Sequence, residues 1–407
     1  MPVNPRTVVV VAFAEALAAP EVVWSLVDDG FVVIAVTRRG TPSALSHSRW
    51  ASLREIPAPE VDAPSAQRAL IELLDEIRRT DAYAEHVLLP LDDTALWLLS
   101  AAALASGWVF AGPRNSSALM LALDKRRQVE AAREAGLRVP PTIIAASIGE
   151  LQSLPFAFPV ILRPALAMRV LDSKILKGRN WICADTAELN AAARAWNGAG
   201  AMLVQPYIEG IGEGVFGMMT PAGVVCWSAH RRLRMMNPHG SGSSACVSRA
   251  VDEDIKNAIG SFLTAVGWSG MFMVELLRDT KGSLHFVEFN GRAWGSMALA
   301  RRLGLEYPAW SVRHALGRDL SAADVPAPRA GVVCRNLGRE LMHLLFVLRG
   351  RRSSAMRRWP GFWPALIEVM RPNAGGSFYN WRRDDWRVFP SDCYYTVMRH
   401  VAKRRRA

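Results

Sequence analysis

Two short apolar segments near residue 280 of this 407-residue chain carry acidic residues in a matching pattern. The first reads Val-Glu-Leu around Glu275, and the second reads Val-Glu-Phe-Asn around Glu288 and Asn290. A polar turn, residues 278–282, separates the two segments, which predicts an antiparallel hairpin. The hairpin would bring two carboxylates and an amide oxygen together.

The expected hairpin closes with Arg278 opposite Ser283. Because side chains alternate between faces along a strand, Glu275, Glu288 and Asn290 then share one face. The two glutamates are diagonal neighbours in this register, roughly 7–8 Å apart at the backbone. A shift of one residue would place them on opposite faces, so the prediction depends on the register.

Like charges on an otherwise apolar hairpin are costly to bury unless a cation lies between them. Oxygen ligands of this kind favour Mg²⁺, with Mn²⁺ as an alternative, and phosphate oxygens and water complete the shell. Two solvated glutamates on an exposed face are the other interpretation. We predict a metal site made by Glu275, Glu288 and Asn290, because the flanking residues are apolar on both strands.

The N-terminal part of the chain must position this hairpin against another layer. Apolar runs without alternation, separated by helical patterns, predict a parallel sheet covered on both faces. Glu15 interrupts the first run, which favours a buried strand over a signal peptide. No glycine-rich loop follows that strand, so no dinucleotide site is expected. The expected strands are 8–13, 31–37, 86–89 and 108–111, with helices at 21–29 and 65–79.

Further helices and strands alternate along the middle of the chain. Asp124 is the expected N-terminal cap of a helix that Gly136 ends. Other expected helices are 186–196, 252–266 and 341–348, and other expected strands are 158–162, 201–205, 271–277 and 283–289.

Charge is distributed unevenly along the chain, whose net charge is +12. Residues 331–407 hold 16 Lys or Arg against 5 Asp or Glu, whereas the preceding residues hold 33 against 32. Arginines and tryptophans alternate in this basic segment, which suits an anionic membrane surface. We expect instead that the tryptophans and the helix at 341–348 pack on the rest of the protein and that only the last few residues are solvated. Membrane binding is the first alternative, and binding to nucleic acid is the least favoured.

The five cysteines are scattered without a CxxC pair. This pattern argues against a zinc site or a disulfide framework and is typical of a reducing cytosol. We therefore expect a cytoplasmic protein, with the basic segment as a candidate contact to the inner face of the membrane.

Residues Glu288 to Arg292, which read Glu-Phe-Asn-Gly-Arg, resemble the closing E-x-N-x-R motif of the ATP-grasp superfamily. The resemblance extends from the N-terminus to about residue 320 and is closest to the carboxylate–amine ligase branch. It implies an α/β fold: a Rossmann-like domain at 1–115, ATP-grasp lobes at 116–205 and 206–325, and a basic extension at 326–407.

The resemblance also implies which residues hold ATP. Lys125 matches a basic residue that reaches the phosphates, and Arg163 stands where the family usually has a lysine. The glycine-rich flap of many relatives is missing after Pro164. Lys174 in a longer flap could contact phosphate instead, or it could be a solvated loop residue.

Residues 202–208 resemble the strand and linker that hold adenine in the family. The resemblance assigns the base edge to Gln205 and to the backbone of Tyr207 and Ile208. It assigns the ribose hydroxyls to Glu213.

The strand at 229–234 and the Gly/Ser loop at 238–244 resemble the family's site for the acceptor carboxylate and transferred phosphate. Arg232 and Arg234 should point together because alternate strand residues share a face. The resemblance implies that Arg292, with Arg232, stabilises an acyl phosphate until an amine attacks it. A small-molecule carboxylate and an amine would be the substrates. The alternative is a catalytically weak ATP-binding module whose basic tail binds membrane or nucleic acid. The oligomeric state is not predicted.

Overall fold

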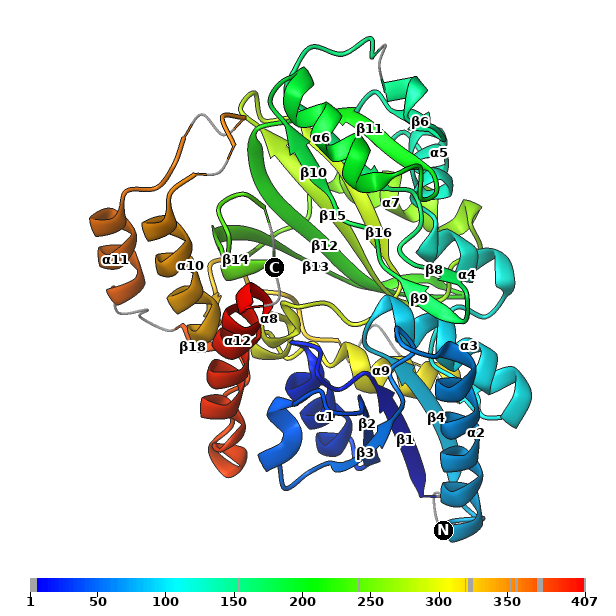
Figure 1. Ribbon diagram of the computed structural model, residues 1–407. Coiled ribbons are helices and arrows are strands. Elements are labelled where there is room, and N and C mark those ends of the chain that lie inside the picture. The colour runs from blue at the N-terminus through cyan, green and yellow to red at the C-terminus, as the bar shows by residue number, and fades with distance from the viewer. Residues whose placement is uncertain are drawn as a thin grey trace.

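The computed structural model describes residues 6–151, 154–240, 242–318, 320, 325–351, 353–355, 358–371 and 376–405, with the backbone alone after residue 400. The described residues form three larger sheets and a separate two-stranded sheet. Figure 1 shows the N-terminal sheet at the bottom, a long twisted sheet across the middle and a smaller sheet at the top. The large sheet therefore lies between the other two, where it can present one site to both.

The N-terminal sheet has five parallel strands in the order β3-β2-β1-β4-β5. Val9 and Val11 of β1 face α1, while Val8 and Val10 face α2 and α3. This arrangement confirms the predicted parallel sheet covered on both faces. Its elements are β1 Thr7–Ala12, α1 Ala19–Asp28, β2 Val32–Arg38, η1 Ala44–His47, β3 Ser52–Ile56, α2 Ala63–Thr80, β4 Glu85–Pro90, α3 Asp93–Ser106 and β5 Val109–Phe110.

The small sheet has the antiparallel order β10-β7-β11-β6 and packs against α6. Helix α6 has the predicted bounds, because Asp185 caps its first turn and Asn197 ends it in a left-handed conformation. A separate hairpin, β8–β9, follows β7. The elements of this region are α4 Ser116–Leu123, α5 Lys125–Glu134, β6 Ile143–Ala145, η2 Gly149–Leu151, β7 Val160–Pro164, β8 Arg169–Leu171, β9 Lys174–Leu176, β10 Trp181–Cys183, α6 Thr186–Trp196 and β11 Met202–Pro206.

The large sheet has the order β16-β15-β12-β13-β14-β17-β18. One face buries Phe272, Val274 and Phe289 against α5 and α7. Phe216 and Met273, on the other face, join the core that also includes α1 and β1. The elements are β12 Gly210–Thr220, β13 Gly223–Met235, β14 Ser243–Arg249, α7 Glu253–Ala265, β15 Gly270–Asp279, β16 Leu284–Asn290, α8 Met297–Arg302 and α9 Tyr307–Ala315.

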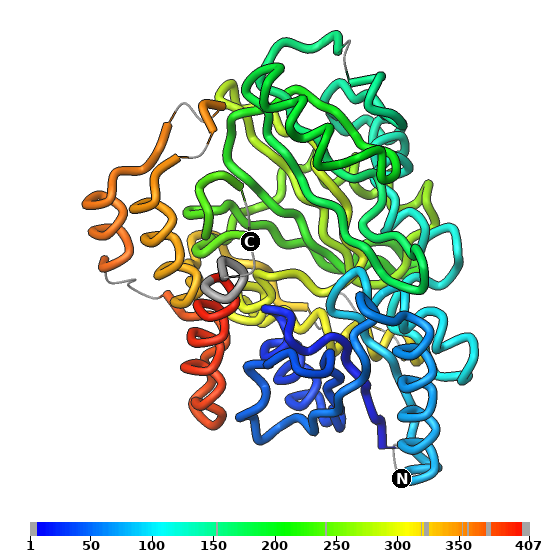
Figure 2. Tube along the Cα trace, viewed as in Figure 1, coloured from blue at the N-terminus to red at the C-terminus, as the bar shows by residue number. Residues whose placement is uncertain are grey.

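The basic C-terminal segment packs on the rest of the protein. Strand β17 pairs with β14, and Trp24 of α1 donates to Asp385 at 2.8 Å. Figure 2 shows the segment along one side of the molecule, from the large sheet to the N-terminal sheet. No described helix is long and apolar enough to cross a membrane. The elements of the C-terminal segment are β17 Val333–Arg335, α10 Leu337–Arg349, α11 Phe362–Met370, β18 Ser377–Phe378, η4 Arg383–Asp385 and α12 Val388–Arg405.

The expected packing of this segment is thus confirmed for its strands and for the inner faces of its helices. It is wrong for Trp363, which is 70% exposed. The predicted domain boundaries remain predictions.

Candidate active site

The hairpin of β15 and β16 carries the acidic residues, but its register differs from the prediction. Arg278 pairs with Leu284, one residue beyond the predicted partner. That shift alone would send the glutamates to opposite faces. A β-bulge at Val287 adds a second shift, so Glu275 lies directly opposite Glu288. The two carboxylates therefore share one face, as predicted. They do so because the bulge compensates for the shifted register, and the prediction did not include a bulge.

Contacts from β7 and α5 hold the bulged strand. Arg163, which is 6% exposed, donates to the Val287 carbonyl at 2.8 Å and to Glu288 Oε2 at 2.7 Å. The amide of buried Gln128 exchanges two hydrogen bonds with the backbone of Phe289, at 3.0 and 3.1 Å. Since the bulge frees a carbonyl and β16 is an edge strand, these partners satisfy backbone groups that would otherwise be unpaired.

Glu288 lies among positive groups. Lys125 Nζ is 3.6 Å from its Oε2, and Asn290 Nδ2 is 3.3 Å from its Oε1. Burial acts to raise the pKa of Glu288, but Lys125 and Arg163 outweigh it and lower that pKa to about 2. The carboxylate is therefore ionised at neutral pH. Lys125 reaches it because the Lys125 backbone N–H binds the carbonyl of Ala165 and places the start of α5 beside β7.

Glu275 forms an ion pair with Arg232 of β13 across the intervening strand β12, which has glycines at positions 212 and 214. Arg232 Nη2 is 2.8 Å from Glu275 Oε1. Strand β12 lies between them with Gly212 opposite Arg232 and Gly214 opposite both Glu275 and His230. A Cβ at Gly212 would lie 2.8 Å from the Arg232 side chain. Glycine is thus needed for the arginine to cross the strand.

His230 is a buried polar residue beside Arg232 that the sequence analysis missed. It is 2% exposed, and neither ring nitrogen has a hydrogen-bond partner among the described residues. Burial, helped by Arg232, lowers the pKa of His230 to about 3, so the ring is neutral. It lines a crevice with Ser228 and Trp294 whose volume of about 10 Å³ is close to that of one water molecule.

Arg292 is oriented by the N-terminal sheet. Asp93, at the start of α3, accepts from Arg292 Nε at 2.6 Å. Burial acts to lower the pKa of Arg292, but Asp93 and Glu288 raise it above its ordinary value. The guanidinium therefore keeps its charge beside the carboxylate hairpin.

The carboxyl edge of the N-terminal sheet faces the same region, where open α/β sheets bind ligands. Arg38 at the end of β2 makes ion pairs with Glu15 at 2.6 Å and with Glu60 and Asp92 at 2.9 Å. Lys177 lies 3.6 Å from Glu60 and from Asp92. Burial raises the pKa of Glu15 despite its arginine partner.

Three of the residues predicted to hold the nucleoside already have hydrogen-bond partners. Gln205 donates to Thr142 at 2.8 Å, and the Tyr207 N–H binds the Pro159 carbonyl at 2.9 Å. Ile208 is half-buried. Glu213 accepts from Arg249 at 2.7 Å and from Arg278 at 2.8 and 3.1 Å. A ribose would therefore have to share Glu213 with two arginines.

Two predicted site residues are not brought to the hairpin. Arg234 does not point with Arg232, because the β13–β14 register shifts between them. Its guanidinium pairs instead with Glu340, at 2.7 Å, and with Glu368, at 2.9 Å, in the C-terminal segment.

Lys174 is exposed on β9, and its hairpin packs against the start of α2 and against Trp97 of α3. The Ala63 N–H donates to the Ser173 carbonyl at 2.7 Å, and the Ile175 N–H donates to the Pro59 carbonyl at 3.0 Å. Sequence reasoning allowed either a phosphate contact or a solvated lysine at this position, and the side chain is exposed here.

The donor set at the hairpin fits a magnesium ion bound together with phosphates. Glu275 and Glu288 face each other, and Asn290 on the same face would offer its oxygen once the amide turns over. No cluster of three or more His, Cys, Asp or Glu side chains suited to a metal occurs among the described residues. The ion would therefore depend on phosphate oxygens and water for the rest of its shell, as Mg²⁺ usually does.

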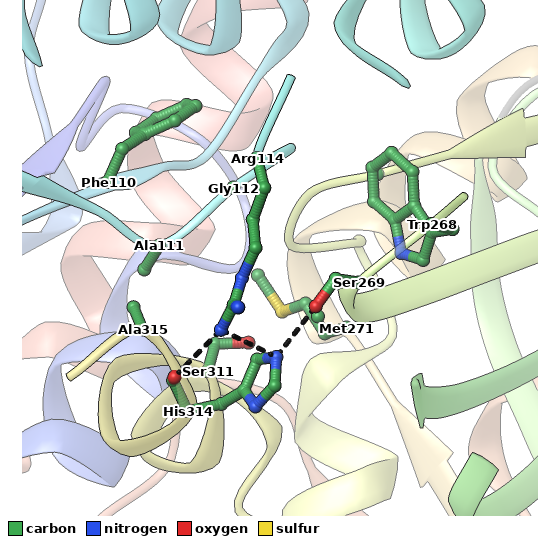
Figure 3. A pocket seen from close by; sticks show the side chains of 12 residues that line it. Phe110, Ala111, Gly112, Arg114, Trp268, Ser269, Met271, Ser311, His314 and Ala315 are labelled. Atoms are coloured by element: carbon green, nitrogen blue, oxygen red, sulfur yellow. Dashed lines mark hydrogen bonds between the residues drawn. The ribbon is translucent and has the colours of Figure 1, made fainter. Parts of the chain in front are cut away.

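A second crevice lies between β5, β15 and α9, apart from the hairpin carboxylates. Figure 3 shows Arg114 and Ser269 converging on His314, with Ser269 at 2.7 Å and Arg114 at 3.3 Å from its Nε2. Its volume of about 10 Å³ admits about one water molecule. It is therefore too small for a nucleotide.

Solved structures with the same fold are numerous, although no family model and no curated protein matches the chain. An L-amino acid ligase from Bacillus licheniformis is 14% identical, with a TM-score of 0.59 over 80% of this chain and 78% of that one. N5-carboxyaminoimidazole synthetase from Staphylococcus aureus is 12% identical, with a TM-score of 0.58 over 79% and 80%.

The biotin carboxylase domain of Hydrogenobacter thermophilus 2-oxoglutarate carboxylase, in complex with MgADP and bicarbonate, is 18% identical. Its TM-score is 0.61 over 80% of this chain and 73% of that one. These likenesses show that the chain shares the fold of these three proteins.

Proposed function

We propose that the protein is an ADP-forming ligase that uses Mg-ATP to join a carboxylate to an amine. The observation that carries the proposal is that Glu275 and Glu288 lie opposite each other on the bulged hairpin. Three positive side chains, Lys125, Arg163 and Arg292, interact with Glu288. Acidic residues flanked by fixed cations suit a magnesium–polyphosphate complex, in which both signs of charge must be matched. The solved structures with this fold include an L-amino acid ligase and an N5-carboxyaminoimidazole synthetase.

The nucleotide would lie between the small sheet and the large sheet. Lys125 and Arg163 would bind its phosphates, and in doing so they would release Glu288 from its present ion pairs. Gln205 with the backbone of Tyr207 and Ile208 would hold the base. Magnesium, held by the hairpin carboxylates and Asn290, would neutralise charge on the β- and γ-phosphates.

The acceptor would lie over the glycine-containing part of β12, next to the carboxyl edge of the N-terminal sheet. A carboxylate oxygen attacks the γ-phosphorus, ADP leaves, and the amine then displaces phosphate from the acyl phosphate. Arg292, fixed by Asp93, and Arg232 would stabilise the phosphate charge in both steps. Neutral His230 would offer one donor and one acceptor to the bound substrate. The substrates themselves remain unassigned.

A catalytically weak ATP-binding module is the second candidate. It is favoured by Arg163 in place of the family's lysine and by the hairpin β8–β9, which contains no glycine and is hydrogen-bonded to residues at and just before the start of α2. Both candidates bind Mg-ATP, whereas only the ligase forms ADP in an acceptor-dependent manner.

Incubation with ATP, magnesium and pooled amino acids, followed by mass spectrometry, tests the proposal. The ligase should release ADP and phosphate together with a product that has lost one water from the sum of acid and amine. A kinase would yield a phosphorylated product instead, and a carboxylase would require bicarbonate. Glu288→Gln should abolish turnover, while the exposed Glu253→Gln should not. ATP binding without acceptor-dependent ADP would favour the module.

A further inference from the structure

Helices α10 and α11 of the C-terminal segment have apolar faces that the rest of the protein leaves uncovered. Three residues on each helix, spaced i, i+4 and i+7, form one stripe per helix. Exposed apolar groups at this density usually mark an interaction site. Their exposed fractions are 43% for Leu341, 38% for Leu345 and 60% for Leu348 on α10, and 70% for Trp363, 59% for Ile367 and 72% for Met370 on α11.

The core does not need these residues, because each helix has a separate buried face. Met342 and Val347 of α10 and Ala365 and Val369 of α11 are buried. The two helices contact each other, and Figure 1 shows them at the outer edge of the molecule, away from the N-terminal sheet. The exposed stripes are therefore additional to the packing that anchors the segment.

The acidic residues of these helices are paired with arginines, whereas further arginines lie at the helix ends. Glu340 is fully buried against Arg234 and Arg335, and Glu368 is paired with Arg234 at 2.9 Å. Both acidic residues of α10 and α11 are thus neutralised by arginines of the protein. Four arginines lie at or beyond the helix ends: Arg349, Arg351, Arg358 and Arg371.

We propose that the outer face of α10 and α11 docks on an anionic lipid surface. Apolar stripes with a tryptophan enter the headgroup region while arginines at the helix ends bind lipid phosphates. The two helices lie side by side, so their exposed apolar residues can meet one bilayer surface together. Neither helix spans the membrane. This inference does not depend on the proposed ligase activity.

Vesicle flotation of the full chain tests the proposal. The protein should float with vesicles of phosphatidylglycerol and phosphatidylcholine at low salt, and only weakly with phosphatidylcholine alone. Leu348→Gln/Trp363→Gln/Ile367→Gln should remove flotation. Leu104→Gln, at a residue of α3 that is 90% exposed, is the matched control and should float like the parent.

A second variant separates charge from apolar contact. Arg351→Gln/Arg358→Gln/Arg371→Gln should weaken binding to anionic vesicles by about fivefold for each arginine removed, and salt should weaken the parent in the same direction. Circular dichroism checks that every variant is folded. If the apolar variant is unfolded, the arginine variant alone tests the proposal.

Four results would overturn the proposal. The parent could ignore anionic vesicles at low salt, or the apolar variant could float as well as the parent. Alternatively, sedimentation could show a dimer that the apolar variant dissociates, or the parent could bind DNA while ignoring vesicles, which would assign the surface to another partner.

Discussion

Replacing Glu340 with glutamine should destabilise the protein strongly, because its carboxylate neutralises two buried arginines. Its side chain is 0% exposed and accepts from Arg234 at 2.7, 3.0 and 3.2 Å and from Arg335 at 2.9 Å. The side chains of the two arginines are 11% and 8% exposed. Removing one member of a buried ion-pair group costs about 3–5 kcal/mol, since the remaining charges stay buried without compensation.

Glu368 supplies the matched control for this experiment, because it pairs with the same Arg234 at 2.9 Å but is 60% exposed. Glu368→Gln should therefore cost only about 0–1 kcal/mol. Urea unfolding followed by tryptophan fluorescence measures both variants against the parent. Equal effects at the two positions would refute the reasoning and would mean that the C-terminal segment is not part of the folded core.

The pH dependence of the same pair can be worked out from the pKa of Glu340. Burial acts to raise this pKa, but hydrogen bonds and charge from Arg234 lower it below its ordinary value of 4.5. A lowered pKa means that the carboxylate contributes stability above about pH 4.5 and loses it as the pH falls through the folded-state value. The difference between parent and Glu340→Gln should therefore shrink below pH 4.5.

Three further predictions concern the active site. Glu288→Gln should abolish ADP formation without unfolding the protein, and activity within a few-fold of the parent would show that the hairpin does not bind the metal. Arg163→Lys should retain ADP formation, because the positive charge is kept. Its free energy of unfolding, measured by thermal denaturation, should fall by about 1 kcal/mol because one hydrogen bond is lost. Complete inactivity would show that the planar guanidinium is required. Asp93→Asn should lower kcat by about tenfold to a hundredfold through a less fixed Arg292, with nucleotide affinity unchanged in calorimetry; a loss confined to affinity would contradict this role.

The sequence predicted the local elements well where capping residues and apolar patterns agree. Asp124 caps α5 and Gly136 follows it with a positive φ, as expected from residue types alone. The hairpin register could not be predicted in the same way. Its bulge at Val287 is satisfied by Arg163, a residue more than a hundred positions away, so the local sequence holds no signal for it.

The divergence of Arg232 and Arg234 has a similar origin. Period-two alternation predicts that they point together, but a register shift in the β13–β14 pair separates them. Arg234 then finds its partners in α10 and α11, which a motif comparison ending near residue 320 does not include. His230 was missed because a single histidine in an apolar strand carries no pattern.

The central claim is that Glu275 and Glu288 hold the magnesium of Mg-ATP. Isothermal titration calorimetry with a non-hydrolysable ATP analogue, with and without magnesium, tests it most directly. The parent should bind at least about tenfold more tightly with magnesium, which corresponds to about 1.4 kcal/mol. Glu275→Gln/Glu288→Gln should bind with the same affinity in both conditions. Absence of heat for the parent at millimolar nucleotide with magnesium, or an undiminished magnesium effect in the double variant, would contradict the account.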